Sequence, residues 1–329
     1  MPTAPPTFAE RLSTTFWGPL LMDRAADGAR ALRYLPKLRP EAHGVQVEVG
    51  RAYGPRREHR YDIYRPTDAT GPLPFAIYIH GGGFQFFDRR SHWAMATEIA
   101  RRGYVVANLD YRLAPRHRYP AAVQDVALAY AHLADAAASL GAVPGQCLLA
   151  GESAGANLAL GLAIASCWQR PEAHTRQVWE APMRPACLLP ACGYLQVDSP
   201  ERHAAHRPLG SVVEARVHAV SRQYLPDHTP PLPEHAFASP LRIVEAAAHT
   251  KALPERPFPP THALVGEVDP VVTDTLRLGA ALQQLGVAVE APVYPGRGHT
   301  FHALPFRDDA RRAWQAQMDF AARHLPPGT

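Results

Sequence analysis

The sequence predicts an α/β fold built on one mostly parallel sheet of about eight strands flanked by helices. From residue 45 onward, short apolar runs typical of strands alternate with longer stretches of helical periodicity. The composition supports a folded protein, because 47% of the 329 residues are hydrophobic and only 19% are charged. Such a composition excludes disordered, collagen-like and coiled-coil chains, and the length allows one large domain or two ordinary ones.

The strands are predicted from runs of apolar or alternating residues. The first two runs, 45–49 and 60–64, alternate with period two and lie close enough in sequence to pair antiparallel. The run 74–80 is continuously apolar and ends in a histidine followed by glycines, as a buried parallel strand would. Further strands are predicted at 104–111, 147–150, 186–190, 263–266 and 287–294.

Four stretches between or after these runs have the pattern of helices. Residues 121–138 place Val123, Val126 and Tyr130 on one face. Residues 154–168 are small and apolar all round, which predicts a buried helix. Residues 273–285 and an amphipathic stretch at 309–324 complete the alternation.

Two segments do not fit the alternation of strands and helices. Residues 1–44 contain helical pieces and no strand. Residues 195–260 are charged and increasingly rich in proline, and the nine prolines between positions 225 and 260 argue against long helices and central strands there. Long insertions in α/β proteins often lie over a site, and a plain surface excursion is the alternative.

The strongest motif is Gly-Glu-Ser-Ala-Gly at residues 151–155. It follows a predicted buried strand and opens the predicted helix 154–168, which is the context in which G-x-S-x-G has chemical meaning. Its glycines permit a sharp turn that lifts Ser153 to the carboxyl edge of the sheet, at a helix N-terminus. Ser153 is therefore a candidate nucleophile.

A second motif, His-Gly-Gly-Gly-Phe at residues 80–84, follows the strand 74–80. Three consecutive glycines cost backbone entropy, and one reason to keep them is a set of N–H groups that converge on an anion. A flexible loop is the alternative. His80 precedes the glycines, so we expect it to orient the loop by a hydrogen bond rather than to act as a base.

Two polar residues follow the last predicted strands. Asp269 comes after the strand 263–266 and His299 after the strand 287–294, at the edge where open α/β sheets place their ligands. The order Ser153, Asp269, His299 is that of an α/β-hydrolase triad. Asp274 and His302 are competing residues: we expect Asp274 to cap or brace the next helix, and His302 to be the less favoured base.

Several motifs together resemble the hormone-sensitive-lipase family of α/β-hydrolase esterases, over most of the chain from about residue 60. They are HGGGF, DYRLAP at 110–115, GESAGA, FASPL at 237–241, DPVVTD and GHTF. The resemblance implies Ser153 as nucleophile, Asp269 as acid and His299 as base. It also implies an oxyanion hole built from the backbone N–H groups of Gly81, Gly82 and Ala154.

The resemblance also implies a mostly helical cap made of the two segments that break the alternation. The expected divisions are a cap segment at 1–44, the catalytic domain at 45–194, a cap insertion at 195–250 and the rest of the catalytic domain at 251–329. We expect the two cap segments to pack together over Ser153, through apolar residues such as Trp17, Leu20, Leu21, Tyr194 and Tyr224.

The function expected from these features is a serine carboxylesterase that cleaves small-molecule esters of short-to-medium acyl chains without a metal or organic cofactor. An amidase, peptidase or acyltransferase with the same triad is the first alternative, and a non-catalytic receptor on the same fold is a more remote one. An aromatic group comprising Phe84, Phe86, Phe87 and Trp93, together with Tyr194, would wall the substrate pocket. An ordinary core role for these residues stays open.

Charge and apolar patterning exclude other classes of partner. The net charge of +4 comes without a dense basic run, so a nucleic acid is not expected as a ligand. No apolar window of about 18 residues predicts a membrane span, and the N-terminus lacks the pattern of a signal peptide, so a cytoplasmic location is expected. The four cysteines are expected to be free buried thiols, with a local Cys187–Cys192 bridge as the alternative. Nothing in the sequence opposes a homodimer.

Overall fold

The computed structural model describes residues 17–226, 233–303 and 307–326, with the side chains of 17–21 and 233–234 left out. Its main sheet has eight strands in the order β1-β2-β4-β3-β5-β6-β7-β9, and two further short strands, β8 and β10, pair with each other. The pairs β1–β2 and β2–β4 are antiparallel and all the others are parallel. The mostly parallel sheet is as predicted, whereas the antiparallel pairing of β2 with β4 was not predicted. The strands are β1 (Val45–Ala52), β2 (Arg60–Pro66), β3 (Leu73–Ile79), β4 (Val105–Leu109), β5 (Ala142–Glu152), β6 (Arg184–Ala191), β7 (Thr261–His262), β8 (Val265–Gly266), β9 (Val289–Glu290) and β10 (Val293–Tyr294).

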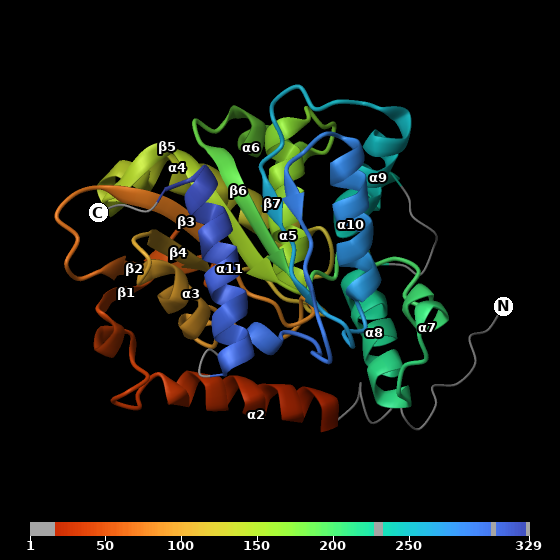
Figure 1. Ribbon diagram of the computed structural model, residues 1–329, viewed down its shortest axis with the longest axis horizontal. Coiled ribbons are helices and arrows are strands. Elements are labelled where there is room, and N and C mark those ends of the chain that lie inside the picture. The colour runs from red at the N-terminus through yellow and green to blue at the C-terminus, as the bar shows by residue number, and fades with distance from the viewer. Residues whose placement is uncertain (1–16, 227–232, 304–306, 327–329) are drawn as a thin grey trace.

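Helices cover both faces of the sheet, so the fold has three layers (Figure 1). One face carries α4, α5, α6, α9 and α10, and the other carries α3 and α11. The helices are α2 (Trp17–Leu32), α3 (Trp93–Ala100), α4 (Ala121–Ala136), α5 (Ala154–Cys167), α6 (Arg176–Glu180), α7 (Arg202–His206), α8 (Ser211–Tyr224), α9 (Pro240–Thr250), α10 (Val272–Gln284) and α11 (Asp308–His324). Short 3-10 turns occupy Pro40–His43, Ala137–Leu140, Ala173–Thr175, Pro233–Ala238 and Phe301–Ala303.

The central strands are apolar on both faces because both faces are covered. In β3, Phe75, Ile77 and Ile79 join the core under α4 and α5, while Ala76 and Tyr78 join the core under α3 and α11. This alternation follows from the two-residue period of a strand. Burial of β3 along its whole length holds the glycine-rich segment that follows it at a fixed place at the sheet edge.

The last part of the sheet differs from the prediction. The run 287–294 was expected to be one strand, but it forms β9 in the main sheet and β10 in the two-stranded sheet. Pro292 lies between them and has no N–H group to continue a ladder. The run 263–266 was also expected to be a strand, but only its last two residues form β8, and the strand of the main sheet, β7, ends before it at His262.

The prolines between 225 and 260 leave room for one helix of ordinary length, α9, and no long helix is found in the described part of this segment. Pro240 is the first residue of this eleven-residue helix, where the missing N–H group costs nothing. The next proline is Pro254, after the helix ends at Thr250. The sequence analysis also missed α3, although Trp93, Ala96 and Ala100 have helical spacing and are buried.

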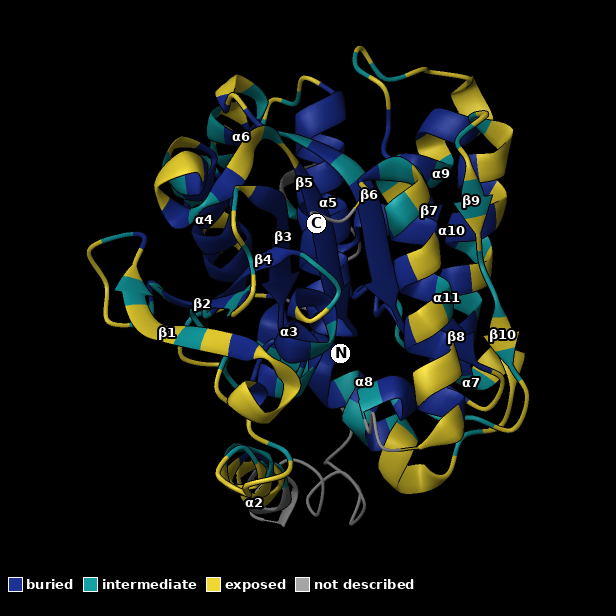
Figure 2. Ribbon diagram, turned by 60° about the vertical axis from the view of Figure 1, so that its left-hand side comes forward, coloured by how far each residue is buried: buried dark blue, intermediate teal, exposed yellow. Residues whose placement is uncertain are grey.

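Of the two segments that break the alternation, residues 1–44 carry α2, and residues 195–260 carry α7 and α8. Helices α2 and α8 lie at the same end of the molecule (Figures 1 and 2). Helix α2 is largely exposed, in contrast to the buried strands (Figure 2). It docks where α3 begins, since Trp93 Nε1 donates to the Ala29 carbonyl at 2.9 Å and Arg30 pairs with Asp88 at 3.2 Å.

The four cysteines are free and buried, so the Cys187–Cys192 bridge does not form. Among the described helices, none combines the length and the apolar character that a bilayer crossing requires.

Candidate active site

Ser153 lies in the tight turn between β5 and α5. Its backbone has φ 54° and ψ −116°, a strained conformation for a residue with a side chain. The turn brings α5 against β3 so closely that a Cβ on Gly155 would lie 2.0 Å from the Ile79 carbonyl oxygen. The Ser153 N–H donates to the Ala191 carbonyl of β6 at 3.0 Å, which fixes the turn at the sheet edge.

His299 connects Ser153 to Asp269 by hydrogen bonds. His299 Nε2 lies 3.0 Å from Ser153 Oγ, and His299 Nδ1 lies 2.9 and 3.0 Å from the two carboxylate oxygens of Asp269. The structure thus brings together three residues that are far apart in sequence. The parallel pairing of β8 with β10 explains the second contact, because Asp269 and His299 each follow one of these two strands.

The surroundings of His299 suit a base. Asp269 is buried, whereas the His299 side chain is 36% exposed and accessible from solvent. Burial by itself would lower the pKa of His299, but the charge and hydrogen bond of Asp269 raise it above its ordinary value of 6.5. The same carboxylate favours the tautomer with the proton on Nδ1, which leaves Nε2 free to accept the serine proton.

The competing residues have other partners. Asp274 accepts hydrogen bonds from the backbone N–H groups of Leu195 and Gln196 at 2.9 and 3.0 Å, and from Arg202, so it braces the start of the insertion. His302 is buried, and burial lowers its pKa to about 4. His80 Nδ1 lies 2.8 Å from the Gly81 carbonyl oxygen, in agreement with a role in orienting the loop.

Of the two backbone N–H groups of the glycine-rich loop that were expected to bind an oxyanion, those of Gly81 and Gly82, the first already has an acceptor. The Gly81 N–H donates to Glu152 Oε1 at 2.5 Å, so it is not free to bind a developing oxyanion. Among the residues described, no protein acceptor is found for the N–H groups of Gly82 and Gly83. Gly82 has φ 104°, and a Cβ there would lie 2.3 Å from the Phe86 carbonyl oxygen, so only glycine fits.

Glu152 is the centre of a buried polar cluster that the sequence analysis did not single out. Besides Gly81, its carboxylate accepts a hydrogen bond from the Tyr78 hydroxyl and lies 2.7 Å from His92 Nε2. Burial would raise the pKa of Glu152, but His92 and Tyr78 lower it below its ordinary value, and Glu152 in turn raises the pKa of His92. The sequence signal was a charged residue at the end of an otherwise apolar strand, inside the G-x-S-x-G motif.

Two buried histidines, His80 and His302, each contribute a loss of stability in mild acid. Burial lowers the pKa of His80 and of His302 from 6.5 to about 4. Between these values the unfolded chain binds protons that the folded chain does not, so the free energy of unfolding decreases as the pH falls. Each histidine contributes about 3 kcal/mol to this decrease. The buried carboxyl of Asp110 acts in the opposite direction, because its pKa is raised to about 6.

The variant His302→Gln isolates the contribution of one histidine, because glutamine does not titrate. Chemical denaturation of both proteins from pH 7 to pH 4 should show a smaller loss of stability for the variant, by about 3 kcal/mol. Parallel losses in the two proteins would contradict the prediction.

The expected pocket residues lie around the glycine-rich loop in different settings. Phe84 is fully buried and stacks on Tyr224 of α8, with ring centroids 3.8 Å apart. Phe86 and Phe87 are half-buried and follow the loop directly. Tyr194 is buried, and its backbone N–H donates to the Ser153 carbonyl at 3.1 Å. Phe84 therefore joins the loop to α8, while the other three remain candidates for pocket walls.

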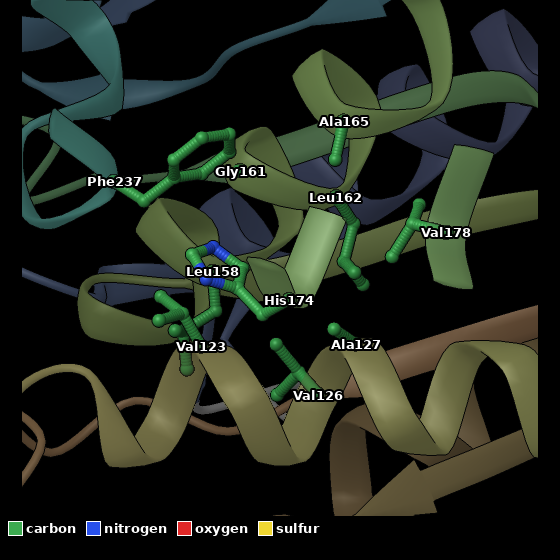
Figure 3. Close-up of a pocket in the computed structure, with 10 residues that line it drawn as sticks. All are labelled: Val123, Val126, Ala127, Leu158, Gly161, Leu162, Ala165, His174, Val178 and Phe237. Carbon is green, nitrogen blue, oxygen red and sulfur yellow. The ribbon is translucent and has the colours of Figure 1, made fainter. Parts of the chain in front are cut away.

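A small apolar cavity of about 10 Å³ lies along α5, and none of the expected pocket residues lines it (Figure 3). Its lining comes from α4, α5 and α6 together with His174 and Phe237, and the rings of His174 and Phe237 meet edge to face. It has room for about one water molecule, so we assign it to core packing. Among the described residues, no cluster of His, Cys, Asp and Glu side chains has the arrangement of a metal site.

Comparison with known proteins places the chain in a family. A family model described as alpha/beta hydrolase fold matches residues 76–303. A versiconal hemiacetal acetate esterase from Dothistroma septosporum is 28% identical over 275 residues, which cover 82% of this chain and 78% of the relative. Esterase LipI from Mycobacterium tuberculosis is 29% identical over 267 residues, which cover 79% and 75%.

A solved structure, that of a bacterial heroin esterase, is similar with a TM-score of 0.73 and 26% identity over 92% of each chain. The matched region contains both glycine motifs, Ser153, Asp269 and His299. The chain is therefore a member of the α/β-hydrolase family, and it belongs to the hormone-sensitive-lipase-like group that its motifs indicated.

Proposed function

We propose that this protein is a serine ester hydrolase that works through an acyl-enzyme at Ser153. The observation that carries the proposal is the hydrogen-bonded series from Ser153 Oγ through His299 to Asp269. The esterase names of the relatives and of the similar structure support the same reaction class.

In the first half-reaction, Ser153 Oγ attacks the ester carbonyl while His299 Nε2 takes the hydroxyl proton. Asp269 stays ionised, holds the imidazole in the required tautomer and stabilises the imidazolium that forms. His299 then gives its proton to the leaving alkoxide, and the alcohol departs. In the second half-reaction, His299 takes a proton from the water that attacks the acyl carbonyl, the bond from the acyl carbon to Ser153 Oγ then breaks, and His299 returns its proton to Oγ as the acid leaves.

The negative charge that develops on the carbonyl oxygen needs donors that are not already engaged. We assign this role to the backbone N–H groups of Gly82, Gly83 and Ala154. In this set, the N–H group of Gly83 replaces that of Gly81. Ala154 is the first residue of α5, where the helix dipole also favours an anion. Gly81 acts indirectly, because its bond to Glu152 fixes the loop beside the nucleophile.

Covalent labelling tests this assignment most directly. An organophosphate such as diethyl p-nitrophenyl phosphate should inactivate the protein with one equivalent bound, and peptide mapping should place the label on Ser153. Prior incubation with a slowly hydrolysed ester should protect against the label. A label on another serine, for example Ser199 or Ser239, would refute the assignment.

The acyl preference and the choice between ester and amide are also part of the proposal. We propose short-to-medium acyl chains, because the buried Tyr194 lies directly against Ser153, with its N–H group bonded to the Ser153 carbonyl. A series of p-nitrophenyl esters of increasing acyl length, measured beside matching anilides, gives both answers. Faster turnover of the anilides would identify an amidase instead.

We further propose that residues 1–44 and 195–250 form a cap over the site. Helix α8 contacts the glycine-rich loop through the stacked rings of Phe84 and Tyr224, and it contacts the segment after β6 through the Tyr194 hydroxyl, which donates to the Val217 carbonyl at 3.4 Å. The N-terminal segment contacts the residues that follow this loop, through Arg30 and Asp88. Trp17, Leu20 and Leu21 belong to α2, but their side chains lie outside the described part of the chain.

Removal of residues 1–35 should therefore change substrate selection rather than chemistry. We expect a higher KM and a shift in the preferred acyl length, because the Trp93 indole and Asp88 lose their contacts with α2. Arg30→Ala, which removes only the ion pair with Asp88, is the milder companion variant. An unchanged acyl profile and KM in the truncated protein would show that the N-terminal segment is not part of the site.

A further inference from the structure

Arg216 of α8 is a partly buried cation beside the glycine-rich loop. Its Nη1 donates to the Gln85 side-chain oxygen at 2.9 Å, and its guanidinium carbon lies 4.8 Å from the centre of the Phe86 ring. Its Nη2 lies 3.0 Å from the place that a Cβ on Gly83 would occupy. The guanidinium thus lies beside Gly83 in the loop and beside Gln85 and Phe86, which follow it.

No acidic side chain of the described residues compensates this charge. Three other partly buried arginines differ, since Arg89 pairs with Asp62 and Asp110, Arg112 with Asp125 and Arg202 with Asp274. Burial lowers the pKa of Arg216 to about 10, with the Tyr194 hydroxyl as the only opposing influence, whereas the pKa values of Arg89 and Arg112 are raised. A partly desolvated cation with one neutral hydrogen bond and one ring contact has donors left for an anion.

The place of Arg216 relative to Ser153 follows from two independent contacts. A Cβ on Gly81 would lie 3.3 Å from Ser153 Cβ. Gly83 is two residues further along the chain, so its Cα lies at most about 7 Å from the Cα of Gly81. On the other side, Tyr194 is bonded to the Ser153 carbonyl by its N–H group and to Val217, the neighbour of Arg216, by its hydroxyl. Arg216 therefore borders the region that an ester bound at Ser153 would occupy.

We propose that Arg216 binds a carboxylate carried by the substrate, so that the preferred substrates are esters with an anionic group on either the acyl or the alcohol portion. The inference rests on the ester hydrolysis proposed above. The planar fork of a guanidinium matches a carboxylate with two parallel hydrogen bonds, and the half-buried setting makes this contact stronger than a surface ion pair. The scissile carbonyl would remain at Ser153, with the second carboxylate held on the α8 side.

Two pairs of substrates test the proposal on the wild-type protein and separate the two places for the charge. On the acyl side, mono-p-nitrophenyl adipate is compared with p-nitrophenyl hexanoate. On the alcohol side, p-acetoxyphenylacetate is compared with its primary amide. At pH 8 and low salt, we expect the anionic member of one pair to have a kcat/KM about tenfold higher or more, and added salt to reduce this ratio.

Variants then assign the preference to Arg216. Arg216→Met keeps an extended apolar stem without the charge. It should lower kcat/KM for the preferred anionic ester by about 10- to 100-fold, mainly by raising KM. The kcat/KM for the matching neutral ester should change little. Arg216→Lys should keep part of the preference, because a point charge replaces the fork. Arg176→Gln, on the exposed helix α6, removes the same charge far from the loop and should leave the ratio unchanged.

The outcomes separate the two proposals. Absence of turnover for every ester would refute the hydrolase. Turnover with the neutral ester preferred in both pairs would refute only the role of Arg216, even if Arg216→Met does not fold. Equal losses for anionic and neutral esters in Arg216→Met would also overturn the proposal, and would mean that Arg216 only supports Gln85 and Phe86.

Discussion

Ser153→Ala is expected to lower kcat/KM for p-nitrophenyl esters by about 10⁴- to 10⁶-fold, with the fold retained. The variant removes the only atom that forms the covalent bond in the proposed reaction. The residual rate would come from the oxyanion donors and from substrate binding, which the substitution leaves in place. The Ser153 hydroxyl contacts His299 and contributes little to the core, so the melting temperature should stay close to that of the wild type.

Ser139→Ala provides a matched control for this experiment. Ser139 is exposed and its hydroxyl donates only to the nearby Ala136 carbonyl, so its loss should not affect turnover. Progress curves measured at high enzyme concentration are needed to detect the residual rate of Ser153→Ala. Activity of Ser153→Ala within about tenfold of the wild type would remove Ser153 from the mechanism.

Asp269→Asn should also have a large effect, about 10⁴-fold in kcat/KM. The amide cannot stabilise the imidazolium, and it favours the wrong tautomer of His299 by donating to Nδ1. The wild-type kcat/KM should rise with pH through an apparent pKa above 6.5, because Asp269 raises the pKa of His299. Without the carboxylate, the apparent pKa of the remaining activity should fall.

The two histidines in this region make the test specific. His299→Ala should remove the activity, while His302→Gln should keep the wild-type dependence of kcat/KM on pH, because His302 is buried and is already neutral above a pH of about 4. The reverse result would mean that the base is His302. A kcat/KM independent of pH between 5 and 8 in the wild type would exclude His299 as the base, because its pKa is raised above 6.5.

The sequence predicts the architecture well where local pattern and burial agree. The apolar runs around Phe75 and Leu149 are long enough to be assigned to buried strands, and the glycines at 151 and 155 locate the turn that carries Ser153. The end of the sheet is harder to predict, because β7 to β10 have two residues each and their pairing depends on the rest of the fold. Residues 289–294 have strand propensity in both halves, and only tertiary structure assigns them to two sheets.

The parts of the site that were missed depend on contacts between distant residues. Glu152 was visible as a charge within a motif, but its bond to Gly81 arises only when β3 and β5 lie side by side. Arg216 gives no sequence signal, because its position near Gly83 requires α8 to fold back over the loop. Asp274 was expected to cap or brace its own helix, and the structure shows that it holds residues 195 and 196 of the insertion instead.

The buried Glu152 divides the site into a fixed part and an adaptable part. One carboxylate holds the glycine-rich loop to the residue next to the nucleophile, and both are anchored to adjacent parallel strands of the sheet. The loop and the nucleophile therefore cannot move apart without breaking the buried hydrogen bond from Gly81 to Glu152, whose carboxylate is also held by His92. Adjustment to substrates of different shape is expected from α8, whose side chains Arg216, Val220 and Tyr224 lie against the loop and the residues that follow it. Substitutions along α8 are thus the route by which substrate range can diverge in such a protein while its chemistry stays the same.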